Sequence, residues 1–174
     1  NAFLMLSNGL EAKVGTLGSK YEFFHEWKRL KESDAGSVEL ETMLRGICEK
    51  KTFLDLLENF ILYDHSGGRT TKILARNHQY LGVNEAVSAY ENRKLKDGRL
   101  GVFWHTQGSG KSYSMVFLAQ KIRRKFAGSP TIVVLTDRDE LNRQISDTFE
   151  NCGLLGKTKA SQFIASSGTD LVKK

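Results

Sequence analysis

The stretch LGVFWHTQGSGKS, residues 100–112, constrains the fold of this chain more than any other. It begins as a short apolar run that predicts a buried strand, and it continues as a glycine loop ending in Gly-Lys-Ser. The next residues, YSMVFLAQKIRRKF, have helical spacing. Strand, glycine loop and helix in this order are typical of a phosphate-binding loop, although His105 stands where the full pattern has its first glycine.

This loop predicts a binding site for ATP and Mg²⁺. Glycines let successive backbone N–H groups face one concavity, and the helix N-terminus adds further free N–H groups. We expect Lys111 to reach the β- and γ-phosphates and the hydroxyl of Ser112 to bind Mg²⁺. The other residues of the predicted ATP site are Gln107, Gly108, Ser109 and Gly110. The alternative is a plain glycine turn beside a surface lysine.

A second strand and a second helix follow the first pair. Residues 131–136 are a β-branched run that predicts a parallel strand. Residues 137–140 then open a helix that is expected to end near Gly153. The order β-α-β-α over residues 100–153 indicates an α/β fold, the start of a doubly wound parallel sheet.

The first twenty residues predict a β-hairpin. Two β-leaning runs, 2–6 and 11–17, flank Ser7-Asn8-Gly9, and Asn-Gly between apolar runs is a strong hairpin signal. Glu11 and Lys13 have the spacing of a nuclease E-x-K pair, but no matching aspartate precedes them. A hairpin is therefore the preferred interpretation, and we expect it to belong to a larger sheet.

Residues 21–68 predict a small helical segment. A helix over 21–31 would bury four apolar side chains, those of Phe23, Phe24, Trp27 and Leu30. Two further helices are expected, one capped by Ser37 and one opened by a capping box of Thr52 and Asp55. The second would bury the stripe of Phe53, Leu54, Leu57, Phe60 and Ile61. The loop over 64–69 is the best linker candidate, and another helix is expected over 84–94.

Composition limits the partners that the chain can have. The net charge of +6 permits an acidic partner such as DNA without requiring one, and the basic run 121–125 is expected on a solvated helix face. There is no apolar run long enough to span a membrane and no signal peptide, so we expect a cytoplasmic protein. Cys48 and Cys152 fit idle thiols in a reducing compartment. Because the chain begins in apolar sequence without methionine, we expect a piece of a longer protein.

Three motifs in order resemble those of superfamily-2 DNA translocases. They are RNHQY at 76–80, GVFWHTQGSGKS at 101–112 and VVLTDRDEL at 133–141. More narrowly, the chain resembles the motor and nuclease subunit of type I restriction-modification enzymes. The upstream stretches LSNGLEAKVGTL and FFHEWKR also resemble the part of that family that joins the nuclease domain to the motor, so the resemblance covers most of residues 1–150.

The resemblance implies roles for residues outside the glycine loop. Arg76 and Gln79 are placed like the motif that recognises adenine, and a glutamine amide can pair with an adenine edge through two hydrogen bonds. Taken alone, Gln79 would be interpreted as a solvated surface residue. Thr136 and Arg138 match a motif that contacts the nucleic-acid backbone. Asp137 is expected to cap the following helix.

The resemblance also implies an architecture: a hairpin from the end of a nuclease domain (1–20), a helical linker (21–68) and the opening part of a RecA-like P-loop sheet (69–174). The intact protein would use ATP and Mg²⁺ to translocate and cleave double-stranded DNA, together with methyltransferase and specificity subunits. This chain lacks a D-E-x-H box and the nuclease carboxylates, so Lys111 is its one expected catalytic residue. The alternatives are another superfamily-2 DNA-dependent ATPase and a nucleotide-binding module without turnover.

Overall fold

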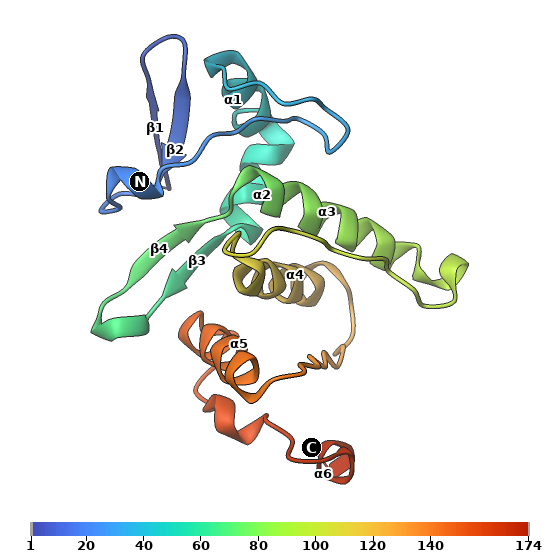
Figure 1. The fold of residues 1–174 in the computed structure, drawn as a ribbon. Coiled ribbons are helices and arrows are strands. Elements are labelled where there is room, and N and C mark those ends of the chain that lie inside the picture. Colours follow the sequence, from blue (N-terminus) through green and yellow to red (C-terminus); the bar gives the residue numbers. More distant parts are fainter. Residues whose placement is uncertain (1, 174) are drawn as a thin grey trace.

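The computed structural model describes residues 2–173 and shows a mixed α/β structure (Figure 1). Within these residues the strands form two antiparallel pairs, β1–β2 and β3–β4. The strands are β1 (Leu4–Ser7), β2 (Ala12–Gly15), β3 (Ile61–Asp64) and β4 (Thr71–Leu74). The α-helices are α1 (Leu40–Ile47), α2 (Lys50–Asn59), α3 (Asn77–Glu91), α4 (Lys111–Lys125), α5 (Asp139–Asn151) and α6 (Gly168–Lys173). Short 3-10 turns are η1 (Tyr21–Phe23), η2 (Ser66–Gly68), η3 (Arg93–Lys96) and η4 (Ala160–Gln162).

The first hairpin is confirmed. Its strands pair antiparallel, with Leu4 opposite Gly15 and Ser7 opposite Ala12. At the turn, Gly9 has a φ of 93°, and the side-chain oxygen of Asn8 accepts the N–H groups of Leu10 and Glu11. This is the turn chemistry that an Asn-Gly pair provides.

The helix predicted over residues 21–31 is wrong. After the short turn at Tyr21–Phe23 the chain runs extended, because His25 pairs with Val14 at the edge of β2. Two backbone hydrogen bonds of 2.8 and 2.9 Å hold this bridge. Trp27 is buried as predicted, but it reaches the core from an extended segment. Pairing with a strand edge therefore overrides the helical spacing of the aromatic residues.

The predicted helices α1 and α2 are confirmed, but their caps are not. Glu39 precedes α1 in an extended conformation, so the cap expected at Ser37 is wrong. Glu49 caps α2, and its carboxylate accepts the N–H of Thr52 at 2.8 Å. Thr52 therefore lies inside the first turn, and Asp55 pairs with another helix instead of closing a capping box.

A second hairpin replaces the end of one predicted helix. Residues 61–64 form β3 instead of continuing α2, and they pair with β4. The loop predicted over 64–69 is confirmed as a glycine turn, in which Gly67 and Gly68 have φ values of 67° and 75°. It joins two paired strands. Helix α3 begins at Asn77, seven residues before the predicted start at 84.

Neither parallel strand predicted beside the glycine loop is formed in the described part of the chain. Residues 100–104 and 131–136 have no strand partner among residues 2–173, and Val102 and Leu135 are 92% and 88% exposed. Strand propensity alone cannot fix a strand, because each strand needs a hydrogen-bonded neighbour. The helices that follow the two runs, α4 and α5, are confirmed, and α5 ends before Gly153 as predicted.

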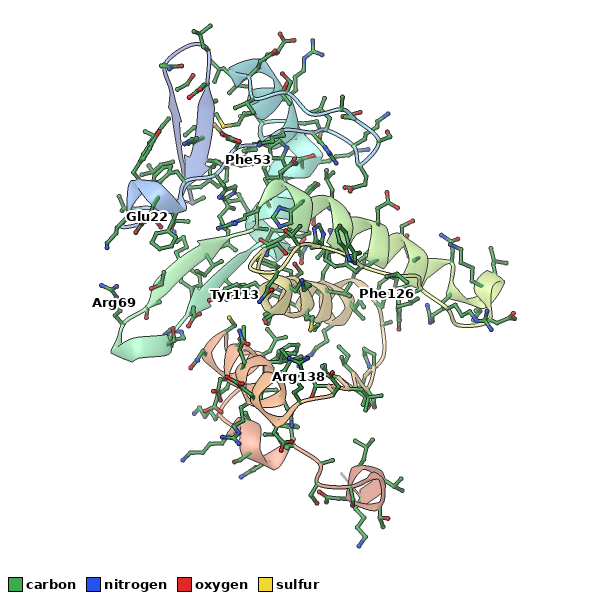
Figure 2. All side chains as sticks on the ribbon, in the orientation of Figure 1. Glu22, Phe53, Arg69, Tyr113, Phe126 and Arg138 are labelled. Carbon is green, nitrogen blue, oxygen red and sulfur yellow. The ribbon has the colours of Figure 1, made fainter. Side chains whose placement is uncertain are left out.

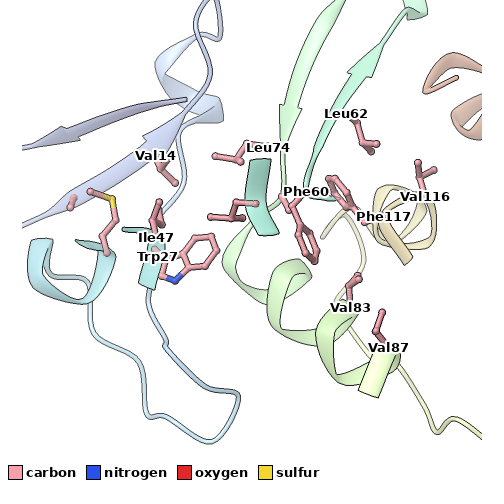
Figure 3. Close-up of a cluster of buried hydrophobic side chains, with 14 of the residues drawn as sticks. Val14, Trp27, Ile47, Phe60, Leu62, Leu74, Val83, Val87, Val116 and Phe117 are labelled. Carbon is pink, nitrogen blue, oxygen red and sulfur yellow. The ribbon is translucent and has the colours of Figure 1, made fainter. Parts of the chain in front are cut away.

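A cluster of buried apolar side chains packs between the hairpins and the central helices (Figure 3). At its centre the ring of Phe60 lies 4.8 Å from that of Tyr80 and 5.6 Å from that of Phe117, measured between centroids. The predicted core is only partly correct: Phe60 is buried, but several expected members are exposed, namely Phe23, Leu30, Phe53, Leu54 and Leu57.

The basic run at the end of α4 does not form a uniformly solvated face. Lys121 is only 6% exposed, because its ammonium pairs with Asp55 on α2. Lys125 remains half exposed and pairs with Glu91 on α3. Among the described residues, no helix has the length and apolar composition needed to cross a membrane.

Candidate phosphate-binding site

The glycine loop stands at the N-terminus of α4, the helix that the core packs against. Gly108 and Gly110 have φ values of 77° and 84°, and Gly110 is the residue before the first turn of α4. Glycine takes this left-handed conformation without steric cost. No side chain of the described residues caps this N-terminus, so its backbone N–H groups are available to an anion.

Lys111 lies folded over its own loop. Its ammonium donates to the carbonyl oxygens of His105 at 2.7 Å and Thr106 at 3.0 Å, and the side chain is exposed. A phosphate oxygen is a stronger partner for an ammonium than a neutral carbonyl. The arrangement therefore keeps a cation at the loop that can exchange carbonyl partners for phosphate partners.

The start of α3 supports the loop from behind. The ring nitrogen Nε2 of His78 donates to the carbonyl of Ser109 at 3.0 Å, and the amide of Gln79 donates to the carbonyl of Gly110 at 2.9 Å. The amide oxygen of Gln79 accepts the N–H of Arg76 at 2.9 Å. Gln79 is 3% exposed, so it is not the solvated surface residue that it would be in isolation. Its role toward adenine stays a prediction.

Two histidines pack against each other at the mouth of the loop. The rings of His78 and His105 lie 4.7 Å apart, and Phe103 lies 4.5 Å from His105 on its other side, measured between centroids. Burial lowers the pKa of His105, and the neighbouring His78 and Lys111 act on it in the same direction. Protonation of His105 is therefore disfavoured, whereas the Lys111 ammonium supplies a positive charge at the loop.

A cleft of about 660 Å³ lies beside the loop. Its walls include Arg76 and His78 from the start of α3, and Trp104, His105 and Thr106 from the loop. Two carboxylates also line it, Glu26 and Glu32, but cationic groups outnumber them, so with its aromatic groups the cleft suits an anionic ligand with a flat ring. The structure thus places the predicted Arg76 in one cavity with the three residues that precede Gln107.

The remaining predicted loop residues differ in exposure. Gln107 is exposed, and Ser112 is half-buried in the first turn of α4. The hydroxyl of Ser109 is buried, and no hydrogen-bond partner for it is found within residues 2–173. A buried hydroxyl without a partner is costly, so the Ser109 hydroxyl is a candidate to bond a ligand oxygen.

Thr136 and Arg138 lie on a separate, more exposed segment. They lie just before α5, on the segment that leaves the C-terminal end of α4. The glycine loop lies at the other end of α4, its N-terminus (Figure 1). The Arg138 side chain is 79% exposed and lies 3.8 Å from the carboxylate of Asp137. Arg138, not Asp137, is the residue before the first turn of α5, and no side chain of the described residues caps it. The cap predicted at Asp137 is therefore wrong.

Sequence reasoning missed the residues that attach the loop to its surroundings. His78 stands beside the predicted Gln79, and Tyr113 directly follows Ser112; both lie inside or next to motifs that the sequence identified. The Tyr113 hydroxyl donates to the carboxylate of Asp64 at 2.5 Å. Figure 2 shows Tyr113 at the start of α4, beside the β3–β4 hairpin. Their proximity to the motifs could have marked both residues as candidates. Their bonding partners, Ser109 and Asp64, lie in distant segments and could not be read from the sequence.

The sequence of this chain is similar to known ATPases and restriction enzymes. Residues 78–174, more than half of the chain, match the family model of the SWI2/SNF2 ATPase. The type I restriction enzyme HindI endonuclease subunit of Haemophilus influenzae is 38% identical over 100% of this chain and 16% of that protein. The putative type I restriction enzyme MjaIXP endonuclease subunit of Methanocaldococcus jannaschii is 30% identical over 98% of this chain and 18% of that protein.

The chain thus spans less than a fifth of the length of these relatives. The similarity to type I restriction endonuclease subunits runs through the whole chain, and the ATPase match begins at His78, beside the loop. The predicted resemblance is confirmed. The chain belongs to the SWI2/SNF2 ATPase family and is a homologue of type I restriction enzyme endonuclease subunits.

Proposed function

We propose that this chain carries the ATP-binding part of the motor subunit of a type I restriction enzyme. The observation that carries the proposal is the glycine loop, which is already curled at an uncapped helix N-terminus with the Lys111 ammonium held above it. The backbone N–H groups of 108–112 would bind the triphosphate. Lys111 would stabilise the charge that develops during phosphoryl transfer.

The same loop offers a ligand for Mg²⁺. Ser112 lies in the first turn of α4 and supplies a hard oxygen, which is the donor type that Mg²⁺ prefers. In phosphate-binding loops of this type a Ser or Thr hydroxyl holds this ion together with phosphate oxygens. A Mg²⁺ ion held by Ser112 would neutralise charge on the β- and γ-phosphates. Gln107, which is exposed, would border the site on its solvent side.

The adenine is proposed to lie in the cleft beside the loop, whose wall includes Arg76, and Gln79 in the first turn of α3 would be its second contact. The Gln79 amide uses one N–H toward Gly110 and one lone pair toward Arg76. A side-chain amide has two N–H groups and two lone pairs on its oxygen, so one of each remains for a base edge. Trp104, on the wall of the same cleft, supplies an aromatic surface.

The two exposed apolar runs are proposed to be neighbouring strands of a RecA-like parallel sheet in the longer protein. Exposed residues in 100–104 and 131–136 have the β-branched and aromatic composition of buried strands. The chain covers only 16–18% of its relatives, so most of their sequence lies outside it. We propose that this sheet starts a unit over 69–174, preceded by the helical linker (21–68) and the end of a nuclease domain (1–20).

The DNA-facing part of the proposal rests on Thr136 and Arg138. Both would contact the DNA backbone, in keeping with the exposure of Arg138 and the net charge of +6. The intact protein would translocate and cleave double-stranded DNA in a complex with methyltransferase and specificity subunits. The free thiols Cys48 and Cys152 fit the cytoplasm as its compartment.

The experiment is the change Lys111→Ala in the intact protein. We expect DNA-stimulated ATP hydrolysis to fall at least about 100-fold, because the charge on the transferring phosphoryl group loses its main partner. The matched control is Lys157→Ala, which removes an exposed lysine away from the loop. Wild-type hydrolysis by the Lys111→Ala protein would overturn the proposal.

A second candidate function is a DNA-dependent ATPase of the SWI2/SNF2 type without nuclease activity, which the family match over 78–174 favours by itself. Cleavage of unmethylated DNA by the intact protein with its partner subunits separates the two. Hydrolysis with cleavage supports the restriction motor, whereas hydrolysis without cleavage supports the second candidate. Binding of ATP without any hydrolysis would instead indicate a nucleotide-binding module.

A further inference from the structure

Helix α4 is attached by polar side chains near its N-terminus. The Tyr113 hydroxyl donates to one carboxylate oxygen of Asp64, the last residue of β3, at 2.5 Å. The other oxygen of Asp64 accepts the N–H of Ser66 at 2.8 Å, so the carboxylate is fixed at both ends. Asp64 is 6% exposed, and Tyr113 directly follows the proposed Mg²⁺ ligand Ser112.

A second attachment lies further along the same helix. The Lys121 ammonium is 2.5 and 2.6 Å from the two carboxylate oxygens of Asp55 on α2, and 2.6 Å from the amide oxygen of Asn84 on α3. These three acceptors match the three N–H groups of an ammonium. The ammonium also lies 4.8 Å from the ring centre of Phe60. Lys121 therefore joins three helices at one buried point.

The spacing of these two attachments determines what they can do. Eight residues separate Tyr113 from Lys121, which is about 12 Å along a helix. Two fixed points at that separation restrict both rotation and sliding of α4, whereas one point would restrict neither fully. The two carboxylate acceptors, Asp55 and Asp64, come from the segment α2–β3, which lies before the residues matched by the ATPase family model, whereas the amide acceptor Asn84 lies within them.

We propose that α2 and β3 form a two-point clamp on α4, in which Asp55 and Asp64 are positioning residues that set the place of the phosphate loop. The clamp rests on the proposed function, because the loop that it positions is the proposed ATP site. The clamp gives the segment α2–β3, which lies outside the ATPase match, a role in nucleotide binding. The segment acts through its bonds to Tyr113 and Lys121.

The chemistry of the two attachments suits positioning better than stabilisation. A buried ion pair contributes little net stability compared with apolar residues of the same volume, but it has a strict geometry. Burial lowers the pKa of Lys121, and the bond with Asp55 acts in the opposite direction. Burial acts to raise the pKa of Asp64, but the hydrogen bonds from Tyr113 and Ser66 outweigh it and hold that pKa below its usual value.

The test uses the intact protein and variants that remove each attachment. The double variant Asp55→Leu/Lys121→Met replaces the ion pair by apolar side chains, and Tyr113→Phe removes only the hydroxyl of the other attachment. For each we expect the Kd for ATP–Mg²⁺ to rise about tenfold, and amide hydrogen exchange over 108–114 to become faster, while the Tm stays within a few degrees of wild type.

Two controls separate positioning from general loss of stability. Lys125, also on α4, forms a half-exposed pair with Glu91 on α3, and Lys125→Met is expected to leave both readouts unchanged. Ile47→Val weakens the core at α1, which does not belong to the clamp, and is chosen for a matching fall in Tm. If this core variant shifted exchange over 108–114 as much as the clamp variants, the clamp would be overturned.

The two proposals fail in different ways. Wild-type exchange over 108–114 in both clamp variants overturns the clamp, whatever their nucleotide affinity. If the wild-type protein bound no ATP–Mg²⁺, the proposed function would be overturned, and with it the assignment of the clamp to nucleotide binding. Faster exchange together with a raised Kd, in the clamp variants alone, supports both.

Discussion

The glycine loop and the segment over 131–138 carry equally clear sequence motifs, yet the structure treats them differently. The loop lies on a packed helix and is bonded to the start of α3 by His78 and Gln79. The other segment is mostly exposed, and its strand is not formed in the described part of the chain. A turn at a helix N-terminus takes its shape from local backbone and packing, whereas a strand depends on neighbours.

The largest expected difference between these regions is in core packing. Phe117 on α4 is fully buried, so Phe117→Ala should lower the free energy of unfolding of the 174-residue chain by about 3–5 kcal/mol. Leu135 is 88% exposed, and Leu135→Ala should change it by less than about 0.5 kcal/mol. Urea denaturation measures both. An equal cost at the two positions would show that the second segment is packed after all.

The next effect is a dependence of stability on pH that comes from His25, which bonds to Ala75 just before α3. Burial lowers the pKa of His25 to about 4, and the charge of Arg76 adds to the shift. Below pH 6.5 the unfolded chain takes up a proton that the folded chain does not, so stability is complete above pH 6.5 and falls toward pH 4. The full loss is about 3 kcal/mol.

The variant His25→Gln isolates this effect, because glutamine keeps a donor for the carbonyl of Ala75 but does not titrate. Thermal unfolding should show a shallower fall in Tm between pH 6.5 and 4 for the variant than for the wild type. Parallel pH profiles of the two proteins would contradict the assignment of the buried neutral state to His25.

A smaller effect is expected at Gly110. Both Gly110 and Gly128 have positive φ, 84° and 101°, so alanine strains the backbone at either position by about 1–2 kcal/mol. Only at Gly110 would the added carbon approach another group, the Gln79 amide at 2.8 Å. Gly110→Ala should therefore also weaken ATP–Mg²⁺ binding, measured by titration calorimetry. Equal affinities in the Gly110→Ala and Gly128→Ala proteins would show that Gln79 does not hold the loop.

The smallest stability effect is expected at Arg138, whose pair with Asp137 is exposed. Arg138→Gln should change stability by less than about 0.5 kcal/mol. If Arg138 contacts a DNA phosphate in the intact protein, the same change should reduce the slope of log K against log salt by about one unit. DNA binding at several salt concentrations measures that slope. An unchanged slope would remove Arg138 from the DNA contact.

The parts of this molecule that were predictable are those that the local sequence determines. The Asn8-Gly9 turn, the glycine loop and the helices α4 and α5 all follow from short-range chemistry. The second hairpin and the extended course of the chain around His25 depend on pairing with distant backbone, which spacing cannot show. The same holds for the partners of the loop. The sequence alone cannot show whether Gln79 is a solvated surface residue or a buried one that bonds to Gly110.

The central claim is that residues 108–112 form a phosphate site that exists before the nucleotide arrives. Amide hydrogen exchange of the intact protein with and without ATP–Mg²⁺ tests it most directly, with Lys111→Ala as the reference. The account predicts that ATP–Mg²⁺ slows exchange at 108–112 in the wild type and much less in the variant. Unchanged exchange at the loop, at a nucleotide concentration that protects another part of the protein, would contradict it.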